Sequence, residues 1–311
     1  MVNRHRTVEN LDGLCTGGAI SIGNFDGVHR GHQMLLQRLR AMADLLDGPA
    51  VVVTFDPSPA AILRPGGVPP QLTTIERRTR LLRECGVDDV VVCKTNRELL
   101  NQTPDDFFSH LVVDQLKAKG VVEGPNFYFG RNRSGDVFRL RQLCQSHGIA
   151  VEIVEPQSDR TSILSSTRVR ELLTEGNVEA ANELLTEPYQ IAGIVVRGSA
   201  RGREIGFPTA NLSEITTLLP GAGVYACRVR VDAHRVLDAA AHIGPNPTFA
   251  EARHKVEVHL LDFSADLYGN LLEVDFIARV RGVIRFPSTA ALMSQLEQDV
   301  QEIRTRLRAT V

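Results

Sequence analysis

The sequence contains no pair of cysteines at the CxxC spacing that zinc ribbons and redox sites use. The five cysteines are odd in number and far apart, which argues against a disulfide framework and predicts reduced thiols; they are Cys15, Cys85, Cys93, Cys144 and Cys227. No apolar run approaches the ~18 residues that would predict a membrane span. The first residues, MVNRHRTVENLDG, lack the apolar core of a signal peptide. We therefore expect a soluble cytoplasmic protein with no membrane partner.

An excess of charge of one sign is also absent. The formal net charge of -2 argues against a large sequence-independent nucleic-acid surface, and no nucleic-acid or protein partner is indicated. The phosphate-binding motif GxxxxGK[ST] and the protein-kinase signatures are missing, so any nucleotide chemistry must use other motifs. What is present is a chain of 311 residues with 43% hydrophobic residues, which is long enough for two domains with buried cores.

The first half of the chain alternates short β-branched runs with helical patterns. A helix start is indicated by Thr103 and Pro104 followed by two acidic residues. Strands that alternate with helices predict a parallel sheet with right-handed crossovers, that is, an α/β domain. The predicted strands are Ala19–Ile22, Ala50–Phe55, Val87–Val92, Gly120–Val122 and Ile149–Val154.

A different pattern begins near Pro188. Short runs rich in valine and aromatic residues are separated by Gly, Pro and Asn turns, which predicts an antiparallel sheet that closes into a small barrel. A terminal helix is predicted from Ser288 to about Arg308, because apolar residues recur there every three or four positions. We place the domain boundary so that residues 1–186 and 187–311 form the two domains. The predicted barrel strands are Gln190–Val196, Gly223–Val231, Val256–Asp262 and Leu271–Arg279.

The segment SIGNFDGVHRGH, residues 21–32, follows a predicted strand and opens a predicted helix. Its glycines let a ligand approach the backbone, and a helix N-terminus favours phosphate. His29 and His32 are three residues apart and would lie on one side of the first turn, where both can donate to phosphate oxygens. A glycine-rich turn with incidental histidines is the simpler alternative, but the flanking strand and helix disfavour it. A metal site is disfavoured because no third ligand accompanies the histidines.

Two later segments carry polar groups in favourable settings. In SSTRVR, residues 165–170, Ser166 is predicted to cap a helix from Thr167 to Thr174, with Gly176 just beyond its end. Such a helix directs N–H groups toward an anion, although a capped surface helix is an equal alternative. In GPNFYFG, residues 124–130, Asn126 lies among aromatic residues, and the two phenylalanines favour ordinary core packing.

The second half carries its own polar motifs. In GSARGREIGFPTAN, residues 198–211, the glycines suit a loop that wraps a nucleotide phosphate, or else a simple hairpin connection. Glu257 and His259 share one face of a predicted strand, and a solvent-facing pair is the simpler interpretation of these two residues.

Together these motifs resemble the bacterial bifunctional riboflavin kinase/FMN adenylyltransferase family, also called FAD synthetase. GNFDGVHRGH resembles its nucleotide-binding motif, and FPTAN resembles its riboflavin kinase signature. The resemblance continues through nearly the whole chain, in the segments TFDPSP (54–59), GPNFYFG (124–130), SSTRVR (165–170), GPNPTF (244–249), VEVHLLDF (256–263) and DLYG (266–269).

The resemblance implies a Rossmann-like domain of the HxGH nucleotidyltransferase superfamily joined to a riboflavin kinase β-barrel. It implies that riboflavin is phosphorylated to FMN and that FMN is adenylylated to FAD, with ATP and Mg²⁺ used in both steps and pyrophosphate released in the second. It assigns His29 and His32 to adenylyl transfer and Glu257 as the general base for the riboflavin 5′-hydroxyl. The implied ligand residues are Gly23, Asn24, Phe25, Gly27, Gly31, Ser165, Ser166, Thr167, Arg168, Gly198, Gly202 and Gly206 for ATP and phosphate, Asp56, Asn126 and Phe127 for flavin, and Thr209 and Asn211 for the metal.

Two positions depart from the family pattern. Ser58 stands where the family commonly has histidine, and its hydroxyl reaches less far and carries no charge. Pro125 stiffens the entry to the flavin-side loop. Two alternatives follow: an enzyme with one of its two activities weakened, or a flavin-binding regulator that retains the fold. The intact HRGH, SSTRVR, FPTAN and Glu257 favour the bifunctional enzyme.

Overall fold

The structure is a computed structural model that describes residues 6–7, 15–155, 164–198, 201–232, 235–246 and 251–309. The chain forms two compact units. The first comprises residues 1–69 and 74–165, and the second comprises residues 70–73 and 166–311. The last part of the GPNPTF segment, residues 247–249, lies outside the described residues.

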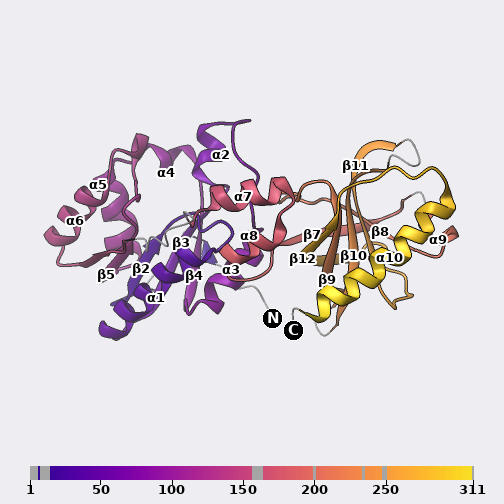
Figure 1. Cartoon of the computed structure of the whole chain (residues 1–311). Coiled ribbons are helices and arrows are strands. Elements are labelled where there is room, and N and C mark those ends of the chain that lie inside the picture. The colour runs from indigo at the N-terminus through magenta and orange to yellow at the C-terminus, as the bar shows by residue number, and fades with distance from the viewer. Residues whose placement is uncertain are drawn as a thin grey trace. The chain divides into compact units, whose positions relative to one another are not determined.

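The first unit is built on a six-stranded sheet in the order β1-β4-β3-β2-β5-β6, and every neighbouring pair is parallel (Figure 1). The predicted parallel α/β domain is confirmed. The five predicted strands are present, with ends shifted by up to two residues, and a two-residue strand joins them at one edge. The strands are β1 (Arg6–Thr7), β2 (Ala19–Ile22), β3 (Ala50–Asp56), β4 (Asp89–Lys94), β5 (Gly120–Glu123) and β6 (Ala150–Ile153).

Helices cover both faces of this sheet. Alternate residues of β3 point to opposite faces, so Val52 packs with α1 and α3 whereas Val51 and Val53 pack with α5, η2 and α6. Thr103 caps α5 as predicted by accepting a hydrogen bond from the N–H of Asp106, and the chain then continues as a π-helix. The helices are α1 (Arg30–Leu45), α2 (Pro59–Leu63), α3 (Ile75–Glu84), α4 (Arg97–Asn101), α5 (Pro104–Phe107), η2 (Phe108–Gln115), η3 (Arg131–Arg133) and α6 (Val137–Ser146).

The strand order places a switch point beside β2. The chain runs from β2 to β3 and β4 on one side, and β5 and β6 lie on the other side. Ligands of open α/β sheets bind at the carboxyl ends of the strands where the order reverses. The segments GNFDG and GPNF leave β2 and β5 at this point, and TFDP ends the neighbouring β3.

The second unit is a closed barrel with the strand order β10-β11-β8-β7-β12-β9, in which all neighbours are antiparallel. The terminal helix α10 (Thr289–Arg308) packs Ile303 and Leu307 on Ala226, Ile277 and Ala278 of the barrel (Figure 1). The predicted barrel and terminal helix are confirmed. The other elements are α7 (Ser166–Glu175), α8 (Val178–Leu184), β7 (Gln190–Val196), α9 (Arg201–Glu204), β8 (Ala210–Ser213), β9 (Gly223–Arg230), β10 (Val236–Asn246), β11 (Glu251–Leu260) and β12 (Leu271–Arg281).

Some details of the second unit differ from the sequence-based prediction. Helix α7 begins at Ser166 itself, one residue earlier than predicted, and Gly176 follows its end with φ +80°. Strands β8 and β10 were not predicted. The centre of β10 is the run Ala239–Ala241, and alanine has little preference for strands, so the run carries no local strand signal.

Candidate active sites

The two histidines of the HRGH motif lie together at the first turn of α1. His29 precedes the helix, and its Nδ1 accepts a hydrogen bond of 3.3 Å from the backbone N–H of His32. The two rings are stacked with their centroids 3.7 Å apart, and the Phe25 ring lies 5.1 Å from the His32 ring. The histidine side chains therefore meet at the helix N-terminus, as the sequence predicts.

Both imidazoles are neutral near pH 7. Burial lowers the pKa of His29 to about 4, with the nearby Asp26 carboxylate opposing the shift. The pKa of His32 lies well below its ordinary value because of burial and the neighbouring His29 and Arg78 charges. Since His29 Nδ1 accepts a hydrogen bond, the proton of this neutral ring resides on Nε2, which can donate to a phosphate oxygen.

The backbone before the histidines is held in an uncommon conformation. Phe25 and Val28 have φ values of +47° and +41°, in a region that residues other than glycine rarely occupy. Bonds to β3 fix this turn: Gly23 donates to the Val53 carbonyl at 2.9 Å, and Thr54 Oγ1 donates to the Asn24 carbonyl at 3.1 Å. Such backbone strain persists only where several contacts hold the backbone in place, and strained residues often lie in functional loops.

Three buried ionisable groups lie at or beside this turn, and sequence reasoning singled out none of them. Asp26 forms an ion pair of 3.2 Å with Arg78, whose side chain is 2% exposed. Glu123, at the end of β5, is buried and accepts a hydrogen bond of 2.6 Å from the N–H of Ile22. Burial raises the pKa of the Glu123 carboxyl well above its usual value. The signal that could have found Glu123 is a carboxylate at the end of a buried strand beside the GNFDG turn.

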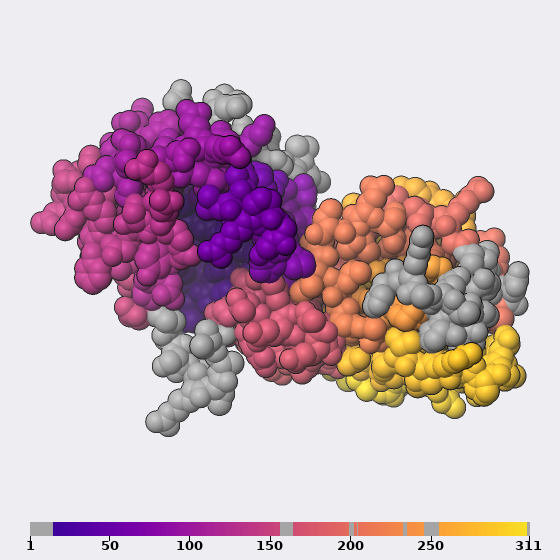
Figure 2. All heavy atoms as spheres, turned by 90° about the horizontal axis from the view of Figure 1, so that it is seen from above, coloured from indigo at the N-terminus to yellow at the C-terminus, as the bar shows by residue number. Residues whose placement is uncertain are grey.

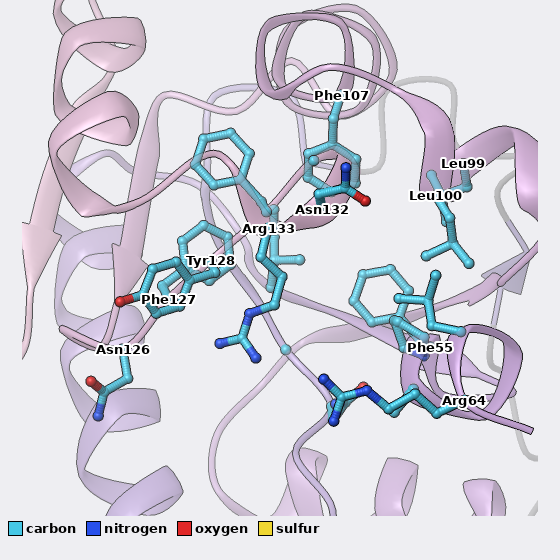
Figure 3. Close-up of a pocket in the computed structure, with 18 residues that line it drawn as sticks. Phe55, Arg64, Leu99, Leu100, Phe107, Asn126, Phe127, Tyr128, Asn132 and Arg133 are labelled. Carbon is cyan, nitrogen blue, oxygen red and sulfur yellow. The ribbon is translucent and has the colours of Figure 1, made fainter. Parts of the chain in front are cut away.

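A pocket of about 420 Å³ opens beside the GNFDG turn (Figure 3). The surface of this unit is hollowed where its indigo and magenta segments meet (Figure 2). Of the predicted flavin residues, Asn126 and Phe127 line the pocket, whereas the exposed Asp56 is not among its lining residues. The other lining residues are Ile22, Gly23, Asn24, Phe55, Pro59, Ala60, Leu63, Arg64, Leu99, Leu100, Phe107, Tyr128, Phe129, Gly130, Asn132 and Arg133.

The pocket combines aromatic walls with positive charge. The Phe127 ring is stacked on the buried Phe129 with centroids 5.3 Å apart, so both rings are part of the core as well as of the pocket wall. The guanidinium of Arg133 lies 4.7 Å from the centroid of the Tyr128 ring. Arg64 and Arg133 point into the pocket from opposite sides (Figure 3). A flat aromatic ligand with a negatively charged group fits these walls, and no sequence signal singled out the two arginines.

The residues of the SSTRVR segment divide between the two compact units. Ser165 is the last residue of the first unit, and Ser166 begins α7 in the second. Thr167 is exposed, Arg168 forms an ion pair of 3.0 Å with Glu171, and Arg170 donates to the Pro70 carbonyl at 2.9 Å. The phosphate-binding role of Ser165, Ser166, Thr167 and Arg168 stays a prediction.

In the barrel, the strand register brings the predicted polar residues into one row. Asn211 of β8 lies directly opposite Glu257 of β11, and Glu257 lies opposite His242 of β10. Residues directly opposite one another project to the same face, with Cβ atoms about 5 Å apart. Asn211 and Glu257 are thus immediate neighbours, although 45 residues of chain separate them in the sequence. His259 forms a hydrogen bond outside this row, since its Nδ1 donates to the Pro208 carbonyl oxygen at 2.7 Å.

The glycine loop packs closely on this row. A Cβ atom at Gly198 would lie 2.2 Å from Asn211 Nδ2, so a larger residue there would displace the Asn211 side chain. A Cβ atom at Gly202 would lie 2.3 Å from the Phe207 carbonyl oxygen and 3.5 Å from Thr209 Oγ1. Gly206 has φ +86°. The predicted loop therefore lies against the oxygen groups predicted to hold the metal, and a pocket of about 400 Å³ borders Gly198 and Asn211.

The donor chemistry of Thr209 and Asn211 fits Mg²⁺ only with help from a substrate. Both side chains provide neutral, hard oxygen donors, and Mg²⁺ is commonly bound by few protein groups together with substrate phosphates. Within the described ranges, there is no cluster of three or more His, Cys, Asp or Glu side chains that could hold a metal by itself. Nucleotide phosphates would have to complete the ligand set.

The folds and polar residues of the two units thus resemble those of a nucleotidyltransferase and of a small-molecule kinase. The family model described as FAD synthetase matches residues 14–168, and the model described as riboflavin kinase matches residues 185–307. The first match covers the N-terminal motifs as far as Arg168 of SSTRVR, and the second covers the motifs of the barrel.

Curated relatives match both halves together. The bifunctional riboflavin kinase/FMN adenylyltransferase of Haemophilus influenzae is 36% identical over 296 residues, covering 95% of this chain and 96% of the relative. The protein of the same name from Escherichia coli K12 is 38% identical over 295 residues and covers 94% of each. The chain belongs to the bifunctional riboflavin kinase/FMN adenylyltransferase family.

A solved structure shares the fold over nearly the full length. The crystal structure of a Streptococcus pneumoniae protein described as a macrolide-efflux protein is 32% identical, covers 96% of both chains and has a TM-score of 0.86. In this chain, among the residues that the structure describes, no helix is long and apolar enough to cross a membrane.

Proposed function

We propose that this chain makes FMN from riboflavin and FAD from FMN, using ATP in both steps, and that each half catalyses one step. The proposal rests on one observation. The chain carries the motifs of both activities and matches bifunctional relatives over about 95% of its length. We place the division of labour at the predicted boundary between residues 186 and 187.

In the N-terminal half, an oxygen of the FMN phosphate attacks the α-phosphorus of ATP, and pyrophosphate leaves. Such a transfer needs alignment and charge neutralisation rather than a covalent intermediate. The stacked, neutral His29 and His32 donate N–H groups to phosphate oxygens beside the N-terminus of α1. The aromatic pocket lined by Asn126 and Phe127 takes the flavin.

In the C-terminal half, the riboflavin 5′-hydroxyl attacks the γ-phosphorus of ATP, and ADP leaves. Glu257 accepts the hydroxyl proton as the new O–P bond forms. Thr209 and Asn211 would hold Mg²⁺ together with the nucleotide phosphates, and the metal would neutralise phosphate charge. The loop with Gly198, Gly202 and Gly206 follows the phosphates closely, since its glycines leave the backbone accessible.

The proposed ligands are small molecules, namely riboflavin, FMN, FAD and ATP, with Mg²⁺ as cofactor, and the proposed location is the cytoplasm. A chain with one weakened activity is the second candidate, and Ser58 is the observation that favours it. Ser58 precedes α2 without forming a side-chain capping bond, and Pro59 and Ala60 of α2 line the flavin-side pocket.

The test is to incubate the purified chain with riboflavin, ATP and Mg²⁺ and to separate FMN and FAD by chromatography. We expect both products from the native chain.

His32→Ala should lower FAD formation by about 100-fold or more, because a transition-state donor is lost, while FMN accumulates. The exposed His110 provides the matched control, and His110→Ala should behave as the native chain. Equal loss of both activities in a folded His32→Ala chain would refute the assignment, and a native chain that binds flavin without making product would be a regulator.

A further inference from the structure

His242 lies beside the proposed general base but has no part in the reaction as described so far. It is the residue of β10 directly opposite Glu257 of β11, and its own neighbour on β9 is Val224. The flanking residues Ala241 and Ile243 are buried in the opposite face of the strand. His242 therefore projects to the same face as Glu257 and Asn211, at the end of their row.

The His242 ring has an unused hydrogen-bonding atom. Its Nδ1 is buried and has no hydrogen-bond partner among the residues that the structure describes. A buried polar atom without a partner is costly, commonly about 1–3 kcal/mol, and calls for an explanation. At a hydrophobic core position, such an atom would serve no purpose, whereas beside a carboxylate it can serve as a donor.

Burial favours a neutral His242 ring, and the two nearby charges act on it in opposite directions. Glu257 is the acidic group that acts on it, and Arg281 of β12 is the basic group. Arg281 is held by a bidentate ion pair with Asp299 of α10, at 2.7–3.0 Å, which keeps the guanidinium in place. Burial is the main influence and lowers the pKa of His242, the Arg281 charge lowers it further, and Glu257 opposes both.

We propose that His242 is a positioning residue of the riboflavin kinase reaction, and that in the complex with substrates its free ring nitrogen donates a hydrogen bond to the Glu257 carboxylate. The inference rests on the proposed role of Glu257 as general base. The carboxylate has two oxygens, and a donor on one of them leaves the other directed at the riboflavin 5′-hydroxyl. The hydroxyl proton then passes to Glu257 as the oxygen bonds to the γ-phosphorus and the bond to ADP breaks. His242 stays neutral throughout.

The test uses the full chain and compares three substitutions of the same residue. His242→Ala should lower kcat for FMN formation about 10–100-fold, the range found when a supporting hydrogen bond to a reactive group is removed, with KM for riboflavin and ATP nearly unchanged. In His242→Asn the side-chain amide takes the place of Nδ1 and should restore most of kcat. In His242→Gln the amide takes the place of Nε2 and should restore less. Circular dichroism and the melting temperature report whether the barrel of each variant is folded, and FAD formation from supplied FMN reports on the N-terminal half.

A double-mutant cycle separates positioning from general packing. Glu257→Asp draws the carboxylate back by one methylene, so His242→Ala should cost much less in that background than in the native chain. Full kcat in His242→Ala, or His242→Asn no better than His242→Ala, would overturn the proposal. If Glu257→Asp and Glu257→Gln both keep native kcat, the proposed base itself fails. Loss of kcat on changing Glu257 without loss on changing His242 refutes the present inference alone.

Discussion

At the scale of single residues, the adenylyltransferase site is made of polar groups that are kept out of water. His29, Asp26 and Glu123 are buried, and His32 is largely enclosed. Glu123 accepts from a backbone N–H, Asp26 pairs with Arg78, and the His32 ring is stacked on the His29 ring. Buried, neutral histidines are donors of fixed direction and do not titrate near pH 7. The same enclosure makes the fold sensitive to acid, because protons bind more readily to the exposed histidines of the unfolded chain.

The sign of this acid effect follows from the lowered pKa of His29. Since that pKa is about 4 in the folded chain against 6.5 when exposed, stability from the neutral ring is present above pH 6.5 and is lost as the pH falls toward 4. At pH 4.5 the expected loss is on the order of 2–3 kcal/mol. In His29→Asn, the amide oxygen can still accept from the His32 N–H but does not titrate. Urea unfolding at pH 7 and 4.5 should show a smaller loss of stability in His29→Asn, and an equal loss in both chains would contradict this account.

At the scale of elements, local patterns predicted most of the fold. Alternating β-branched runs located β2 through β6, the capping residue Thr103 located the start of α5, and the spacing of apolar residues located α10. The alanine-rich β10 was missed, because its strand character comes from pairing with β9 and β11 rather than from its own residues. His242 was missed with it, since a residue's cross-strand neighbour depends on register, which sequence spacing does not give.

The candidate sites were predictable to a similar degree. His29 could be identified from the residues themselves, because it lies between a glycine-rich turn and a predicted helix, whereas Asn211 and Glu257 were identified through the resemblance to the family. Arg64 and Arg133 could not be identified, because they enter the pocket from segments 69 residues apart that carry no motif. Their convergence is a property of the folded sheet and its loops.

The start of α2 offers a test at the same scale. Ser58 precedes this helix and forms no side-chain capping bond, so Ser58→His removes no hydrogen bond there. A histidine side chain reaches further and can donate to phosphate. We expect Ser58→His to keep the fold and to leave the rate of FAD formation unchanged or raise it a few-fold in steady-state assays. A large fall in that rate, with an unaltered melting temperature and unaltered FMN formation, would show that the loop is built around the smaller residue.

At the scale of the whole molecule, the compact units do not end where the predicted domains end. Helices α7 and α8, residues 166–184, group with the barrel. The Asn182 side chain donates to the Phe276 carbonyl and accepts from the Tyr189 N–H, both at 2.8 Å. Glu179 accepts from the N–H of Arg279 at 3.0 Å. These contacts join the two helices to β7 and β12 of the barrel.

Fragments of the chain test what these helices contribute. A fragment of residues 187–311 lacks the contacts of Glu179 and Asn182, whereas a fragment of residues 166–311 retains them. We expect both fragments to convert riboflavin to FMN and neither to make FAD. The longer fragment should melt at least several degrees higher, since about 1 kcal/mol shifts the melting temperature by 2–8 °C in domains of this size. Equal melting temperatures would mean that α7 and α8 add no stability to the barrel.

The central claim is that the two halves perform separate chemistry, and Glu257→Gln in the full chain tests it most directly. This substitution removes the proposed base while keeping the size of the side chain. Supplied with riboflavin, ATP and Mg²⁺, the variant should form almost no FMN, and therefore no FAD. Supplied with FMN in place of riboflavin, it should form FAD at the native rate. Failure to make FAD from FMN in a folded variant, or undiminished FMN formation from riboflavin, would contradict the account.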